Sequence, residues 1–140
     1  MPRSERIAFV CPRFAEGATV GGAETLLRWQ AERAAMAGRS VTFLTTCAEN
    51  HFTWANDLPA GPKQAGPILV HRFPVDGDRD VGTFLRVQAA ISRGGLVSEA
   101  DERAWIENSV NSRALCRHLE ERLGEFDRVV AGPYLFGTTV

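Results

Sequence analysis

The chain has 140 residues, of which 44% are hydrophobic and 24% are charged, and its formal net charge is −1. This size and composition predict one globular domain, and the balanced charge excludes the strongly basic surface that nucleic-acid binding requires. No apolar run reaches the length of a membrane span. The three cysteines form no CxxC pair, so we expect buried thiols in a reducing cytoplasm rather than a disulfide framework or a zinc site.

The first predicted unit is a strand, a loop and a helix. Residues Ile7 to Cys11 form a short apolar run, typical of a strand that is buried on both faces of a parallel sheet. A loop that contains Gly21 and Gly22 follows, and helix-forming residues then continue from Ala23 to Ala37. Gly38 suits a left-handed helix C-cap. This order of elements is typical of a site where backbone amides closely approach a ligand.

The next segments predict a parallel sheet. Ser40 to Thr46 reads as a second strand and completes a βαβ unit, whose crossover is nearly always right-handed. Residues 48–67 carry three prolines and two glycines and predict a loop, in which we expect Phe52 and Trp54 to pack on the sheet edge. Ile68 to Pro74 predicts the third strand.

Helices are expected between the third and fourth strands. Helical spacing of apolar residues predicts one helix, and two serines that precede further apolar repeats predict the N-caps of two more. The predicted features are a helix over Val81–Ser92, a helix that starts after Ser98 and breaks at 108–111, a helix that starts after Ser112 and ends at Gly124, and a strand over Arg128–Ala131. His71, in the third strand, is expected to be a core or edge histidine because no second metal-type residue lies at useful spacing.

The glycine loop matches neither of two common phosphate-binding motifs. A P-loop requires lysine and a hydroxyl residue after its last glycine, where this chain has Ala23 and Glu24. The dinucleotide fingerprint requires Gly-x-Gly-x-x-Gly directly after the strand and an acidic residue after the second strand, where residues 45–47 are Thr-Thr-Cys. Two interpretations remain. Gly21 and Gly22 open a helix whose free amides bind an anion or a polar ligand, or they form an ordinary turn.

The order of strand, Gly21-Gly22-Ala23-Glu24 and helix resembles the N-terminal domain of retaining glycosyltransferases of the GT-B fold, the "group 1" or family-four type. Later segments are similar to one bacterial branch of that family, namely HFTWAN at 51–56, VHRFP at 70–74, Trp105, and PYLFGTT at 133–139. The resemblance extends over the whole chain. It implies that residues 1–140 are a Rossmann-like, three-layer α/β/α domain with a mostly parallel sheet, and that a C-terminal nucleotide-sugar-binding domain is absent from this chain.

The resemblance also implies a function. Such enzymes transfer a sugar with retention from a UDP- or GDP-linked donor to a glycan or lipid-linked acceptor in polysaccharide biosynthesis. They need no metal or other cofactor, because backbone amides and basic side chains stabilise the leaving diphosphate. The expected location is the cytoplasm, including the inner face of the plasma membrane. The implied residues are Gly21, Gly22 and Glu24 for the donor-phosphate and acceptor loop, and Arg13, Phe14 and Tyr134 for the acceptor cleft.

Two departures from the family limit what can be transferred. Many members carry a histidine two residues before a proline after the fourth strand, and matching on Pro133 places Ala131 there, so no catalytic residue is assigned. Without the nucleotide-sugar domain, this chain alone is expected to be inactive. Two alternatives from other classes remain, a stand-alone α/β domain that binds a small phosphorylated ligand at the Gly21-Gly22 loop, and a structural or regulatory interaction domain.

Overall fold

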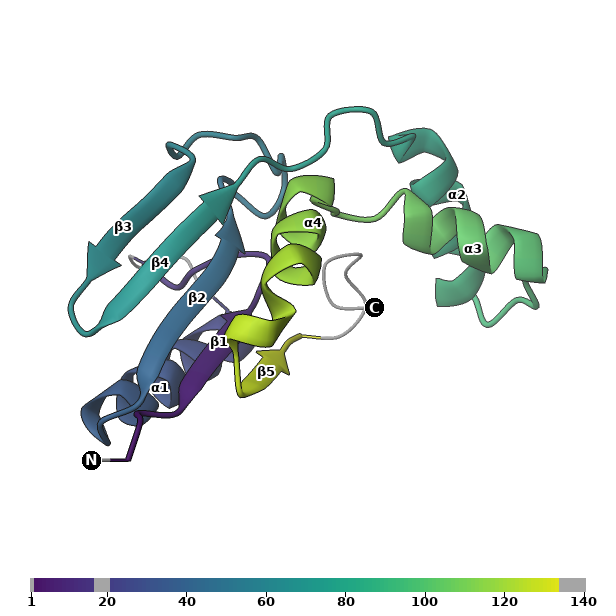
Figure 1. Ribbon diagram of the computed structural model, residues 1–140. Coiled ribbons are helices and arrows are strands. Elements are labelled where there is room, and N and C mark those ends of the chain that lie inside the picture. Colours follow the sequence, from purple (N-terminus) through teal and green to yellow (C-terminus); the bar gives the residue numbers. More distant parts are fainter. Residues whose placement is uncertain (1, 17–20, 134–140) are drawn as a thin grey trace.

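The computed structural model describes residues 2–16 and 21–133, which form an α/β fold with a five-stranded, mostly parallel sheet (Figure 1). The described helices and strands are β1 (Arg6–Val10), α1 (Gly22–Met36), β2 (Ser40–Thr46), β3 (Gly61–Ala65), β4 (Ile68–Phe73), α2 (Val81–Ser92), α3 (Glu99–Glu107), α4 (Arg113–Arg122), a 3-10 turn (Leu123–Glu125) and β5 (Arg128–Ala131). None of the described helices is both long enough and apolar enough to cross a membrane.

The strands lie in the order β3-β4-β2-β1-β5. Strands β4, β2, β1 and β5 run parallel, which confirms the expected parallel core, and β3 pairs antiparallel with β4. The prediction of a loop throughout residues 48–67 is therefore wrong for β3. This strand, GPKQA, is polar and largely exposed, so it carries no hydrophobic alternation. Its position at the sheet edge tolerates Pro62, and Gly66, with a φ of 58°, supplies the left-handed residue of the hairpin turn.

Helices α1 and α4 cover opposite faces of the sheet, α1 behind it and α4 in front of it in Figure 1. Along β1, Ile7 and Phe9 pack with Leu27 and Ala31 of α1. The alternate β1 residues, Ala8 and Val10, pack in a second cluster that includes Leu115 of α4. The two-face burial of β1 explains its continuous apolar sequence.

The predicted helix ends are confirmed where a local signal marks them. The Ser98 hydroxyl accepts a hydrogen bond from the Asp101 amide, and the Ser112 hydroxyl accepts one from the Leu115 amide. Gly38 has a φ of 87°, the left-handed conformation expected after a helix. The chain is non-helical between α3 and α4, as the sequence of residues 108–111 predicts.

Helices α2 and α3 form a hairpin that projects away from the sheet (Figure 1). The Trp105 indole donates to the Gln88 side-chain oxygen at 2.9 Å, and its ring stacks on Phe84 with 6.2 Å between centroids. We predicted that the aromatic residues of the 48–67 loop pack on the sheet edge. Trp54 instead packs against a small cluster of Ala48, Val75 and Val110, which lie after β2, after β4 and between α3 and α4. Phe52 is 81% exposed and does not pack on the sheet.

Candidate functional site

The candidate site lies at the carboxyl ends of the parallel strands. Strand β1 lies between β2 and β5 in the sheet. The chain reaches β2 through α1 on one face of the sheet, and it reaches β5 through α4 on the other face. In open α/β sheets, connections that leave on opposite faces create a crevice beyond the carboxyl ends of the strands, where ligands bind. The Thr46 amide donates to the Pro12 carbonyl at 3.3 Å, and the Gly132 amide donates to the Val10 carbonyl at 3.0 Å. These bonds fix the segment after β1 between the ends of its two neighbours.

The first turn of α1 presents backbone donors at this edge. Gly21 is the N-cap residue, with extended backbone angles of −71° and 165°, and has no side chain that could cap the helix. Within the described residues, no hydrogen bond from the amides of residues 22–24 to an acceptor is seen. Unpaired amides and the positive end of the helix dipole together favour an anion at this position.

A buried ion pair connects the first turn of α1 to the segment after β1. The Arg13 guanidinium donates from Nε and Nη2 to Glu24 Oε1 at 3.2 and 2.8 Å, and from Nη1 to the Glu49 carbonyl at 3.0 Å. The side chains of Arg13 and Glu24 are only 6% and 14% exposed. A Cβ atom on Gly21 would lie 2.5 Å from Glu24 Oε2, so glycine at this position leaves room for the carboxylate.

Phe14 is part of the core below this edge. Its ring meets Phe43 edge to face at a centroid distance of 4.9 Å, and the guanidinium carbons of Arg28 and Arg72 lie 4.6 and 5.9 Å from its centroid. Arg72 also pairs with Glu16 at 3.3 Å. The Phe14 side chain is therefore a buried packing residue that contacts two arginines, and it does not present an exposed aromatic surface to a ligand.

A cavity of about 370 Å³ opens beside Arg13. The loop after β2 supplies the rest of its lining, with the side chains of Glu49, Asn50, His51, Phe52 and Asp57. The His51 and Phe52 rings lie 3.9 Å apart between centroids. Carboxylates, an amide and an exposed ring are groups that can hydrogen-bond and stack on a polar ligand such as a sugar.

The implied site residues are brought together only in part. Arg13 and Glu24 contact each other and adjoin Gly21, whereas neither Gly21 nor Gly22 lines the cavity beside Arg13. Tyr134 lies outside the described residues. Glu49, Asn50 and Asp57 line the cavity but were not predicted as site residues. Their sequence signal is weak, because they are only polar residues in a loop that follows a buried strand.

The cysteines and the possible metal ligands of the described residues do not form a further reactive site. Cys11 is fully buried, and its burial raises the pKa of the thiol to about 11, so it is a neutral packing group rather than a nucleophile. Cys47 is also buried, but Cys116 is partly exposed, so the expectation of three buried thiols is wrong for that residue. Within residues 2–16 and 21–133, no three His, Cys, Asp or Glu side chains lie close enough together to hold a metal ion.

Comparisons of the chain with family models, with curated proteins and with solved structures found no significant match. The fold and the site therefore define the class of the protein only as an α/β domain with a five-stranded, mostly parallel sheet and an anion-favouring helix start at its carboxyl edge. Any function is argued from the residues at that edge.

Proposed function

We propose that this chain is the acceptor-side domain of a retaining glycosyltransferase of the GT-B type, which transfers a sugar from a UDP- or GDP-linked donor to a glycan or lipid-linked acceptor. The arrangement of β4-β2-β1-β5, with helices on both faces, supports a Rossmann-like half of such an enzyme. The resemblance of the strand, glycine loop and helix to that family supports the same assignment. A fold alone fits many functions, so the proposal depends on the site.

The observation that carries the proposal is the space that the described residues leave empty beside the Cα atom of Gly22. Gly22 is the first residue of α1, it has no left-handed φ, and a Cβ atom placed on it would meet no atom of the described residues within 4 Å beyond its chain neighbours and its own helix. The described contacts therefore do not require glycine at this position. A glycine is required there if a ligand or a facing domain approaches the backbone closely, as a diphosphate at a helix N-terminus does.

The surrounding residues fit roles in such a reaction. The amides of the first turn of α1 stabilise negative charge on the departing diphosphate or on a phosphorylated acceptor. The Arg13–Glu24 pair positions this turn because it connects the turn to the end of β1. In the cavity beside Arg13, the carboxylates of Glu49 and Asp57 can accept hydrogen bonds from sugar hydroxyls, and the exposed ring of Phe52 can stack on a sugar face.

The test compares two glycine variants in the protein that joins this domain to a nucleotide-sugar-binding domain. Gly22→Val places a β-branched side chain at the proposed site. Gly124→Val makes the same change at another position where a Cβ atom would meet no described atom within 4 Å, in the turn after α4 at the opposite end of the strands. The assay measures UDP or GDP released from UDP- and GDP-hexoses, and thermal unfolding of both variants is measured alongside.

We expect Gly22→Val to lower nucleotide release by about 100-fold, the scale of loss that a small misplacement of a reacting group produces. Gly124→Val should retain the parent rate, and both variants should unfold near the parent temperature. A Gly22→Val enzyme of undiminished rate would remove the loop from the chemistry. Absence of release with both donor classes in the parent protein would refute the transferase assignment.

The free amides of α1 also support a second candidate, an α/β domain that binds a small phosphorylated ligand without a partner domain. Isothermal titration of the chain alone with UDP and GDP separates the two candidates. A glycosyltransferase half requires its nucleotide-sugar domain for binding, whereas a stand-alone domain binds tightly by itself.

A further inference from the structure

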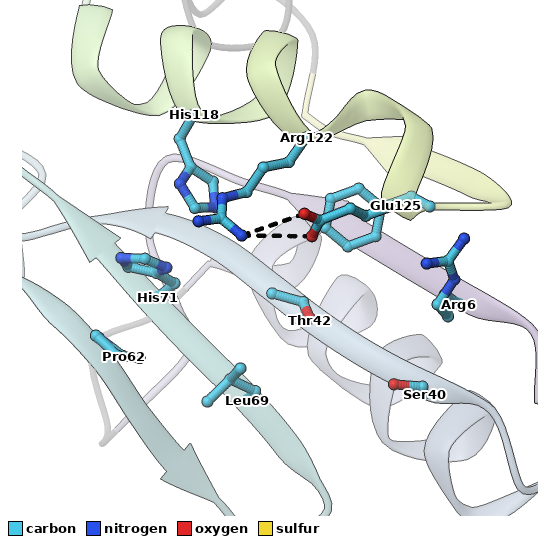
Figure 2. Close-up of a pocket in the computed structure, with 10 residues that line it drawn as sticks. Arg6, Ser40, Thr42, Pro62, Leu69, His71, His118, Arg122 and Glu125 are labelled. Atoms are coloured by element: carbon cyan, nitrogen blue, oxygen red, sulfur yellow. Dashed lines mark hydrogen bonds and ion pairs between the residues drawn. The ribbon is translucent and has the colours of Figure 1, made fainter.

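A second concavity, of about 380 Å³, lies at the other end of the strands, on the face that α4 covers (Figure 2). We call it the α4 groove, and the side chains that matter for its chemistry are Arg6, Thr42, His71, His118, Arg122 and Glu125. They come from β1, β2, β4, α4 and the turn after α4. The α4 groove is separate from the first turn of α1, so its properties do not depend on the proposed transferase function.

The α4 groove exists because the side chains on this sheet face change from apolar to polar along the strands. On β4 the buried Phe73 gives way to His71, and on β2 the buried Leu44 gives way to Thr42. Leu115 of α4 packs on the apolar half. The polar half forms the floor of the groove, whereas faces of mostly parallel sheets are normally covered by apolar packing.

Two histidines meet at this groove from different elements. The rings of His71 and His118 lie 4.7 Å apart between centroids, at 69° to each other, and the Phe73 ring stacks on His71 at 4.3 Å. Figure 2 shows the imidazole of His71 on β4 and that of His118 on α4, which meet edge to face, with the Arg122 guanidinium beside His118. No hydrogen bond from either imidazole to another described residue is found, and their ring contacts are with each other and with Phe73. Their ring nitrogens are therefore available to a ligand.

The basic groups of the α4 groove repel one another when charged. Burial is the main cause that lowers the pKa of His71, and the charges of His118 and Arg122 lower this pKa further. Burial also lowers the pKa of His118, with Arg122 adding to the effect, while Glu125 and Glu121 partly oppose it. An anion placed between these groups would remove the repulsion and favour the protonated imidazoles.

Two more charged residues, Arg6 and Glu125, line the groove. Arg6 lines it beyond Glu125, and its Nε is buried without a hydrogen-bond partner in the described chain, with the Asp127 carboxylate 3.6 Å away. Glu125 is the acidic residue among those that line the groove. It accepts hydrogen bonds from Arg122 at 3.3 and 3.4 Å, but both side chains are about half exposed, so this pair is weak and can open.

We propose that the α4 groove binds a soluble phosphate monoester, whose phosphoryl group lies between Arg122 and the adjoining imidazoles of His71 and His118. Arg122 supplies a forked pair of donors, each protonated imidazole supplies one donor, and the Thr42 hydroxyl lies on the floor below. A dianion matches this set better than a carboxylate does, because it balances the two charges that the imidazoles gain.

The first experiment titrates the chain with sulfate and follows the imidazole resonances by NMR. Sulfate is a probe of the right shape that stays a dianion from pH 5.5 to pH 8, so a change in affinity over that range reports on the protein. The three histidines of the chain include His51, which lines the other cavity and is an internal control. We expect sulfate to shift the signals of His71 and His118 but not those of His51, and its affinity to rise about tenfold or more as the pH falls.

Matched variants test the geometry. Arg122→Gln removes a cation that lines the α4 groove, whereas Arg117→Gln removes an exposed cation of the same helix that does not line it. We expect Arg122→Gln and His71→Gln to weaken sulfate binding about tenfold or more and Arg117→Gln to change it less than twofold. Glycerol 3-phosphate should compete with sulfate, whereas vesicles that contain phosphatidic acid should not bind.

Several results would overturn the proposal. Equal weakening by Arg117→Gln and Arg122→Gln would show general ionic attraction, and equal shifts of all three histidines would show the same. Binding to the phosphatidic acid vesicles without competition by glycerol 3-phosphate would indicate a lipid surface instead. Shifts of His71 and His118 with Zn²⁺ and none with sulfate would replace the anion site by a two-histidine metal site.

Discussion

Replacement of Glu24 by alanine tests whether the Arg13–Glu24 ion pair holds the first turn of α1 in place. The substitution leaves Nε and Nη2 of Arg13 without their acceptor. The guanidinium, on a side chain that is only 6% exposed, keeps the Glu49 carbonyl as its one remaining acceptor among the described residues. Removal of one partner of a buried pair costs roughly 3–5 kcal/mol. Because Glu24 is 14% exposed and water can enter the space it vacates, we expect the lower end, about 3 kcal/mol.

The measurement is urea unfolding followed by tryptophan fluorescence. The control is Glu99→Ala, which breaks the exposed Arg103–Glu99 pair, where the two side chains are 69% and 87% exposed. We expect that control to cost less than about 0.5 kcal/mol. The double variant Arg13→Leu/Glu24→Leu should recover much of the lost stability, because it removes the unpaired buried charge as well. A cost for Glu24→Ala as small as that of Glu99→Ala would refute the reasoning.

Two further predictions concern the core and the acid limit of stability. Leu115→Ala should lower the free energy of unfolding, measured by urea unfolding, by roughly 2–5 kcal/mol because the Leu115 side chain is fully buried. Leu119 is only partly buried on the same cluster, so Leu119→Ala should lower it by about half as much. An equal loss of stability in the two variants would contradict this dependence on burial. The backbone amide of Arg6, with Arg3 nearby, lowers the pKa of Asp127 below its ordinary value of 3.8. Its contribution to stability is therefore complete above pH 3.8 and is lost as the pH falls below that value, so Asp127→Asn should flatten the acid side of a stability–pH curve, and an unchanged curve would exclude this contribution.

The sequence predicted those elements whose signal is local. A β-branched apolar run, helical spacing and serine N-caps gave the bounds of β2, α2 and β5 and the starts of α3 and α4. Such signals act within a few residues, so they survive without knowledge of the partner surface. β3 carries no such signal, because a polar edge strand is defined by the backbone groups of its neighbour.

The candidate site was likewise predictable only where its signal is local in the sequence. Gly21, Gly22 and Glu24 could be placed at a helix start from spacing alone, and the structure agrees with that placement. The pairing of Arg13 with Glu24 and the cavity beside Arg13 could not be predicted, since they depend on how the segments after β1 and β2 fold onto the sheet edge.

By itself, the sequence determined an α/β domain, a parallel core and a glycine-started helix after the first strand, because hydrophobic periodicity and turn residues act through near neighbours in the chain. Only the tertiary structure decided that α1 and α4 cover opposite faces, that Phe14 is buried against two arginines, and that His71 meets His118 beside a polar groove. These contacts join residues far apart in the sequence, and the register of the sheet and the packing of the helices fix them.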